Sequence, residues 1–117
     1  MPMWHDKPQA WHEILPGVRR RILAHGPSTM LVLYHIDPHR TFPEHAHPQA
    51  QSGTFLEGGG SFRVGESVWR LSVGDAYFVP PNVPHELVTE DAPSVILDVF
   101  APGREDFLNE ALPPDER

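Results

Sequence analysis

Apolar residues occur along the chain in short runs, separated by turns that contain proline or glycine. The run MLVLYHI at 30–36 is nearly continuous, and helical periodicity is weak everywhere before the C-terminal end. Short apolar runs bounded by turn residues are typical of β-strands. The pattern therefore predicts an all-β protein with strands at 18–24, 29–36, 41–46, 51–57, 61–64, 67–71, 76–79, 85–88 and 94–100.

Two local features add to this architecture. The segments 61–64 and 67–71 are predicted to pair as a hairpin across Gly65 and Glu66. After Pro102 and Gly103, acidic residues stand in the first turn of a short predicted helix at 104–108. Short strands with turns between them predict a sandwich or barrel, here followed by a short C-terminal helix.

Composition narrows the classes of function. A length of 117 residues suits a single domain over residues 1–117. The formal net charge of −7 argues against nucleic-acid binding, and the absence of cysteine excludes disulfides and thiolate chemistry. No apolar run is long enough to cross a bilayer, and the first residues lack the apolar segment of a signal peptide. We therefore expect a cytoplasmic protein with neither a membrane nor a nucleic-acid partner.

Histidine is unusually frequent, with eight residues against nine lysines and arginines together. His45 and His47 are two apart, so on a strand both side chains would leave the same face. Gln51 has the same parity but follows Pro48, and His85 comes after the stiff run PPNVP. Three imidazoles and an amide oxygen would suit one divalent ion of Zn, Ni, Fe, Mn or Co, with positions open for water or substrate. These spacings alone leave open the alternative of two surface histidines beside a turn.

The spacings also resemble the two sequence motifs of the cupin superfamily. The first motif corresponds to HAHPQAQSGTFLEGG and the second to GDAYFVPPNVPHELVT. The resemblance covers residues 16–108 and implies the cupin barrel, a jelly roll or double-stranded β-helix, around one divalent metal ion. The metal ligands that it implies are His45, His47, Gln51 and His85.

Three positions depart from the family pattern without removing a ligand. His39 stands where the first motif usually opens with glycine, Asn82 replaces a turn glycine, and Thr89 replaces the closing asparagine. Asparagine tolerates a left-handed backbone better than most residues, so we expect its turn to survive. A fourth difference is Gln51 in place of the more common glutamate. A neutral ligand leaves the site with the ion's full charge, which should attract anionic substrates.

The C-terminal run ILDVFAPGREDFL and the HxHxxxQ arrangement are similar to the small pectin-degradation cupins, which open the ring of unsaturated uronates. This likeness implies catalytic roles for Asp98, Phe100 and Arg104. If strand alternation holds, Ile96, Asp98 and Phe100 share one face. An inward carboxyl group would have a raised pKa and could act as a general acid or base, whereas the alternative is an outward, solvated aspartate.

Two of these implied catalytic residues keep a second interpretation. Arg104 is either a clamp for a substrate carboxylate at the barrel mouth or a helix-terminal arginine paired with Glu105 or Asp106. Phe100 is either a core residue or a platform for the substrate.

The orientation of three further residues stays open at this point. Tyr77 and Phe78 alternate, so one of them should line the cavity. His35 is either a proton shuttle that points into the cavity or, as we expect, a core or interface histidine.

These observations predict a metal-dependent enzyme for a small anionic substrate, with ring opening of an unsaturated uronate as the expected reaction. One alternative is an iron-dependent dioxygenase, since a three-histidine scaffold with open positions can bind O₂. Another is a non-catalytic module that binds a small molecule. We also expect a homodimer, because MLVLYHI is too apolar for an exposed strand and the aromatic residues Trp4 and Trp11 need a surface to cover.

Overall fold

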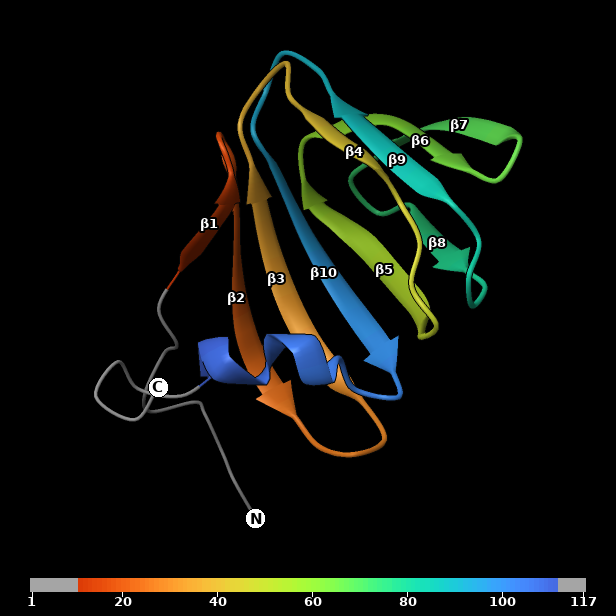
Figure 1. Ribbon diagram of the computed structural model, residues 1–117. Helices are drawn as coiled ribbons and strands as arrows, with labels where there is room; N and C mark the ends of the chain where they lie inside the picture. The colour runs from red at the N-terminus through yellow and green to blue at the C-terminus, as the bar shows by residue number, and fades with distance from the viewer. Residues whose placement is uncertain (1–10, 112–117) are drawn as a thin grey trace.

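The computed structural model of the protein describes residues 11–111, except the side chains of 109–111. Ten β-strands and one 3-10 helix follow one another in this part of the chain (Figure 1). They are β1 (His12–Leu15), β2 (Val18–His25), β3 (Met30–Ile36), β4 (Thr41–His45), β5 (Ala50–Glu57), β6 (Gly59–Val64), β7 (Ser67–Ser72), β8 (Ala76–Val79), β9 (His85–Thr89), β10 (Ser94–Ala101) and η1 (Glu105–Ala111).

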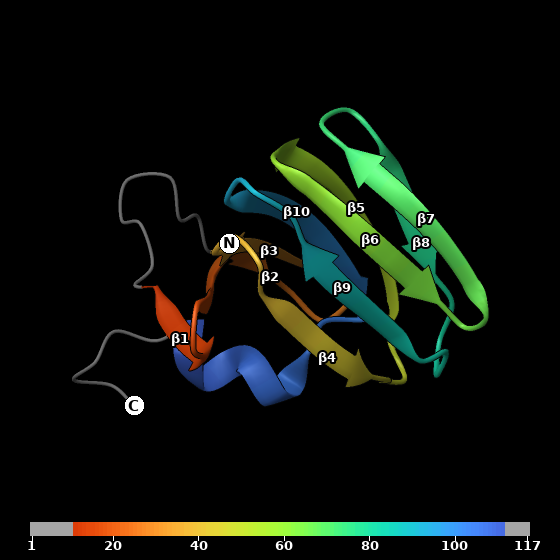
Figure 2. The same cartoon turned by 90° about the horizontal axis from the view of Figure 1, so that it is seen from above.

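The strands form two antiparallel sheets that face each other (Figures 1 and 2). The larger sheet has the order β1-β2-β3-β10-β5-β8 and the smaller one the order β4-β9-β6-β7. Strands distant in sequence pair at the centre of each sheet, with β10 between β3 and β5, and β9 between β4 and β6. The predicted all-β jelly-roll barrel is confirmed.

The inner faces of the two sheets enclose the core. On β3, buried and half-buried residues alternate along the whole apolar run, so that only every second side chain faces the interior. The same alternation on β10 buries Ile96, Asp98 and Phe100 together. The core consists of Val18, Ile22, Met30, Val32, Tyr34, Ile36, Phe55, Phe62, Val79, Leu87, Ile96, Phe100 and Phe107.

Two turns replace a family glycine with another residue. In the described part of the chain, the non-glycine residues with positive φ are His39, at 54°, and Asn82, at 64°. These are the two positions at which the sequence departs from the glycines of the cupin motifs. The Asn82 N–H donates a 2.8 Å hydrogen bond to the carbonyl of His47. This hydrogen bond links the second motif to the first.

The C-terminal helix differs in type and in bounds from the predicted one. It is a 3-10 helix at Glu105–Ala111, not a helix at 104–108. Short helical segments commonly take the 3-10 form, because a few residues cannot offset the cost of nucleating an α-helix. Its Phe107 is 3% exposed and packs edge-on against Phe100, with ring centroids 5.8 Å apart. The helix therefore covers the end of the barrel interior (Figure 1).

An additional strand precedes the predicted ones. β1 is only four residues long and pairs with β2 at the edge of the larger sheet, which explains why its weak pattern gave no prediction. Trp11, just before it, packs edge-on against His35 with ring centroids 6.2 Å apart. Trp4 lies outside the described residues. Within residues 11–111, no helix is long and apolar enough to cross a membrane.

Candidate metal centre

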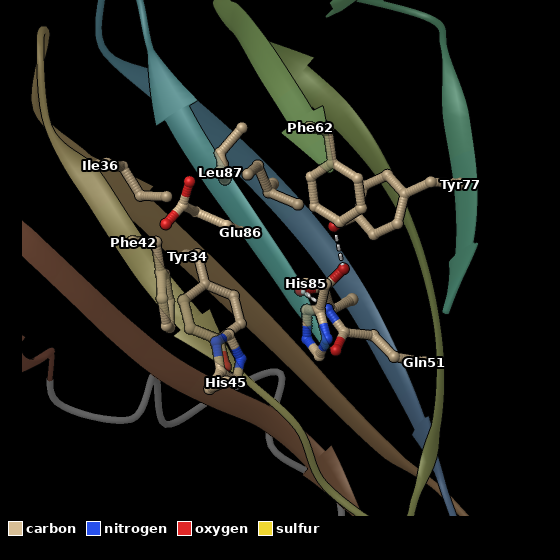
Figure 3. Close-up of a pocket in the computed structure, with 12 residues that line it drawn as sticks. Tyr34, Ile36, Phe42, His45, Gln51, Phe62, Tyr77, His85, Glu86 and Leu87 are labelled. Carbon is tan, nitrogen blue, oxygen red and sulfur yellow. Dashed lines mark hydrogen bonds between the residues drawn. The ribbon is translucent and has the colours of Figure 1, made fainter. Parts of the chain in front are cut away.

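Three strand ends bring three of the four predicted ligands, His45, Gln51 and His85, together between the sheets (Figure 3). His45 is the last residue of β4, Gln51 is the second residue of β5, and His85 is the first residue of β9. His45 and His85 are direct cross-strand partners. β4 ends at residue 45, one residue earlier than predicted, so His47 lies two residues beyond the strand and strand alternation does not place its side chain.

The three imidazoles form a compact group that could hold a metal ion. Each offers one ring nitrogen, and these atoms all lie within 4.8 Å of one another. The ring centroids are 4.2 Å apart for His45 and His85, and 5.0 Å apart for His47 and His85. His85 and His47 are buried, and His45 is half-buried. The alternative of two surface histidines beside a turn is therefore wrong.

Backbone carbonyls fix the orientation of all three rings. The Nδ1 atoms of His45, His47 and His85 lie 2.9, 3.0 and 2.9 Å from the carbonyl oxygens of Pro43, Gln49 and Val83. A carbonyl only accepts, so each Nδ1 carries the proton and donates it. The lone pair then resides on Nε2 in each ring, which is the form that binds a metal ion.

The Nε2 atoms have surroundings that fit a bound cation. The Nε2 atom of His85 is buried and has no hydrogen-bond partner, which is costly for a polar atom. The Nε2 atom of His47 lies 2.9 Å from Oε1 of Gln51. Because Nδ1 of His47 carries the proton, both of these atoms are acceptors and cannot hydrogen-bond to each other. Their separation instead fits two ligands of one ion, since ligands about 2.1 Å from an ion and at right angles to each other would be about 3 Å apart.

Gln51 is oriented by a neighbour on the next strand. Its side-chain Nε2 donates a 3.0 Å hydrogen bond to Oδ2 of Asp98, so its Oε1 points toward His47. The residue is 6% exposed. Gln51 thus presents an oxygen to the histidine cluster, as the cupin motif implied.

Burial keeps the imidazoles neutral at neutral pH. Desolvation is the main cause that lowers the pKa of His45 and His47, and it lowers that of His85 to about 4. The positive charge of Arg104 lowers all three pKa values further. A neutral imidazole needs no deprotonation before it binds a metal ion.

Asp98 faces the interior and is 3% exposed. It accepts hydrogen bonds from the hydroxyl of Tyr77 at Oδ1 and from the amide of Gln51 at Oδ2. Burial raises the pKa of Asp98 to about 7, although both hydrogen bonds act in the opposite direction. Asp98 therefore has the inward orientation, and the alternative of an outward, solvated aspartate is wrong.

Phe100 and Arg104 lie beside the cluster. Phe100 is 1% exposed and packs edge-on against the ring of His47, with centroids 5.3 Å apart. The guanidinium carbon of Arg104 lies 5.0 Å from the Phe100 ring centroid. Arg104 also donates hydrogen bonds of 3.0 and 2.8 Å to Asp106 through Nε and Nη2. Phe100 is therefore a core residue, and Arg104 makes the pairing with Asp106 that was one of its two interpretations.

A pocket extends from the histidine cluster into the barrel (Figure 3). Its polar lining includes His45, His85, Gln51 and Asp98, and its apolar lining includes Ile36, Phe42, Phe62, Leu87 and Ile96. Two tyrosines also line it, Tyr34 and Tyr77.

The pocket settles the orientations that alternation alone left open. Tyr77 faces inward, and Phe78 faces outward with 58% exposure. His35 lies on the outer face of β3, where its Nδ1 is 3.0 Å from Nη2 of Arg19, so it is not a shuttle in the cavity. Tyr34 was not singled out from the sequence. Period-two alternation with Val32 and Ile36 on β3 would have predicted that it faces inward.

Comparisons with known proteins agree with this geometry. The cupin domain family matches residues 32–100. The pectin degradation protein KdgF of Dickeya dadantii is 31% identical over 104 residues, which cover 88% of this chain and 94% of that protein.

Two solved structures have the same fold over most of their length. The structure of KdgF from Halomonas sp. has a TM-score of 0.80 and 31% identity, covering 84% of this chain and 90% of that one. An RmlC-like cupin from Shewanella frigidimarina has a TM-score of 0.81 and 30% identity, with coverage of 88% and 91%. The likeness to pectin-degradation cupins is confirmed, and the chain belongs to the cupin domain family.

Proposed function

We propose that this protein is a metal-dependent cupin enzyme that opens the ring of a small unsaturated uronate. The observation that carries the proposal is one continuous set of contacts, in which Gln51 presents its oxygen to His47 and its amide to Asp98. This arrangement combines a candidate metal site with a buried acid–base group beside one pocket. The similarity to KdgF of Dickeya dadantii, which is named a pectin degradation protein, and to the structure of KdgF from Halomonas sp. supports a uronate as substrate.

The proposed cofactor is one divalent transition metal ion held by His45, His47, Gln51 and His85. Three imidazole nitrogens and an amide oxygen suit Zn, Ni, Fe, Mn or Co. When bound, such an ion polarises oxygen atoms of the substrate as a Lewis acid. Because all four ligands are neutral, the site would retain the ion's positive charge and favour an anionic substrate.

Arg104 is proposed to bind the carboxylate of the uronate. Its pair with Asp106 uses Nε and Nη2, and an arginine carries five N–H donors in all. A substrate carboxylate can therefore be bound at the remaining edge of the guanidinium group. Phe100, which lies between Arg104 and His47, would keep the two groups at a constant separation.

Asp98 is proposed as the proton-transfer group. It gives a proton to the double-bond carbon that does not carry the ring oxygen, while water adds a hydroxyl group to the other carbon and returns a proton to Asp98. The hemiketal then opens as its bond to the ring oxygen breaks and the hydroxyl proton moves to that oxygen, which leaves a ketone in an open chain. A pKa of about 7 lets Asp98 both give and take a proton near neutral pH.

The test is the ultraviolet absorbance of a 4,5-unsaturated uronate, which disappears when the conjugated double bond is lost. Metal-loaded protein is expected to remove this absorbance with and without O₂. Asp98→Asn should lower kcat by about a hundredfold or more while the metal content stays unchanged, since an amide cannot cycle a proton. A fully loaded wild-type protein that leaves the absorbance untouched would reject the uronate, and activity that requires O₂ would favour a dioxygenase.

We further propose that the protein is a homodimer. Leu31, Leu33, Val95 and Leu97 lie half-buried on the outer face of the larger sheet, and Val99 is 37% exposed there. A contiguous apolar face of this kind is typical of an interface between subunits. A second copy of the chain, which presents the same face, is the proposed partner.

A further inference from the structure

Three residues on adjacent strands form one row across the inner face of the larger sheet. Gly53 on β5 is the cross-strand partner of Tyr77 on β8 and, on its other side, of Asp98 on β10. Strands are about 4.8 Å apart, so Tyr77 and Asp98 start from backbones roughly 10 Å apart. Even so, the Tyr77 hydroxyl donates a hydrogen bond to Oδ1 of Asp98.

The glycine makes this contact possible. A Cβ atom at Gly53 would overlap Oδ1 of Asp98 and the Tyr77 hydroxyl, and would lie 2.5 Å from Cζ of the Tyr77 ring. Gly53 does not have a positive φ, so its backbone conformation does not require glycine. Space between its two neighbours is the physical reason for glycine at this position.

Two aromatic rings hold the phenol in place. The Tyr77 ring stacks on Phe62, with centroids 4.3 Å apart and 28° between the planes. It also packs edge-on against Phe55 at 6.2 Å. Packing against these two rings therefore fixes the direction from which the Tyr77 hydroxyl reaches Asp98.

We propose that Tyr77 is a positioning residue for Asp98, acting through the space that Gly53 leaves open. The inference rests on the proposed function of Asp98 as the proton-transfer group. With Oδ1 held by Tyr77, Oδ2 remains directed at the Gln51 amide, and the Gln51 oxygen remains directed at His47. Loss of the phenol would let the carboxyl group rotate and would loosen this whole chain of contacts.

The first test is a double-mutant cycle on kcat for the unsaturated uronate. Tyr77→Phe keeps the stacked ring and removes only the hydroxyl. We expect kcat to fall about ten- to hundredfold and KM to change by less than about threefold. In the Asp98→Asn background the same change should lower kcat by less than about threefold, because the group on which Tyr77 acts is gone.

The matched control is Thr54→Val, which also removes one hydroxyl from the same strand pair. Thr54 donates a 2.8 Å hydrogen bond to the carbonyl of Asp75 in an exposed position. This variant is expected to leave kcat unchanged in both backgrounds. Equal losses from Tyr77→Phe in both backgrounds, or no loss in the wild type, would overturn the inference.

A second readout does not depend on activity. The side-chain amide protons of Gln51 can be assigned by NMR from their absence in Gln51→Ala protein, with Zn²⁺ added throughout. In Tyr77→Phe these resonances should shift, and their exchange with water should be at least about threefold faster, since Asp98 would no longer hold the amide. In Thr54→Val they should stay unchanged.

This readout separates the two hypotheses. If the wild-type protein fails to convert the uronate, the proposed function fails, and the NMR comparison alone decides the role of Tyr77. The NMR comparison also decides the role of Tyr77 in the case that turnover by Asp98→Asn is too slow to measure. Gln51 resonances that are the same in Tyr77→Phe and wild type would then overturn the inference.

Discussion

The side-chain amide of Gln51 donates a 3.0 Å hydrogen bond to Oδ2 of Asp98. The same amide group presents its oxygen to His47 at 2.9 Å. One neutral side chain thus links the candidate metal ligands to the proposed proton-transfer group. A glutamate at this position could accept but not donate when ionised, so the link depends on the amide.

Gln51→Glu should therefore strengthen metal binding and weaken catalysis. A carboxylate is a better ligand than an amide oxygen for a divalent ion, but it would face Asp98 across about 3 Å, and like charges at that distance raise the pKa of the pair. We expect tighter binding in chelator competition and a kcat at least about tenfold lower. An active enzyme with unchanged kcat would show that the amide link is dispensable.

Metal content should depend most strongly on the histidines. His47→Ala is expected to empty the site, whereas Gln51→Ala should only lower occupancy, because an amide oxygen is a weak ligand. His35→Ala is the matched control, since His35 lies on the outer face of β3. Elemental analysis of protein purified without an affinity tag measures all three variants, and full metal content in His47→Ala would refute the assignment.

The stability of the metal-free protein should carry a pH signature of Asp98. Its pKa rises from an ordinary value of 3.8 to about 7 in the folded state, so the folded protein holds this proton where the unfolded chain loses it. The stabilisation is fully present below about pH 4 and is lost as the pH rises through 7. Relative to Asp98→Asn, the wild type should lose about 2–3 kcal/mol between pH 5 and pH 8.

The pH dependence of stability must be compared with that of Asp98→Asn, because the histidines change the stability with pH in the opposite direction to Asp98. Their pKa values are lowered, that of His85 to about 4, so their contribution is present above about pH 6.5 and is lost as the pH falls. Urea unfolding at both pH values measures the difference between the two proteins. Parallel pH profiles for wild type and variant would contradict a raised pKa at Asp98.

Arg104→Lys should mainly impair substrate binding. Lysine keeps the charge but loses the planar fork that matches a carboxylate, so we expect KM to rise about tenfold with little change in kcat. Arg70→Lys is the control, because Arg70 makes a similar two-pronged pair with Glu90 on an exposed strand. Steady-state kinetics on the uronate test both, and equal KM values would remove Arg104 from the substrate site.

The proposed dimer can be tested on the outer face of β10. Light scattering at micromolar concentration should give the mass of two chains for the wild type. Leu97→Arg should produce monomers, because a charge on this face opposes its burial against a second copy. Val68→Arg on β7 is the control, since Val68 is 59% exposed. A monomeric wild type would contradict the proposal.

The sequence by itself determined the fold class and which residues of β10 share a face. Period-two alternation groups Ile96 with Asp98 and Phe100, and any packing of β10 must keep them together. The spacing of His45, His47 and His85 matched the cupin motifs because those motifs describe turns and strand ends that recur with the fold. His39 and Asn82 stand where the cupin motifs have glycine, and both adopt a left-handed backbone. These departures from the motifs therefore did not change the turns.

The tertiary structure alone decided which face was inward and which side chains met there. Alternation separates Tyr77 from Phe78, but only the packing of one sheet on the other put Tyr77 inside. The row of Tyr77, Gly53 and Asp98 depends on the register of three strands that are distant in sequence, and no local pattern encodes that register. Gln51 follows a turn, so its amide orientation came from Asp98 across the sheet and not from the periodicity of its own strand.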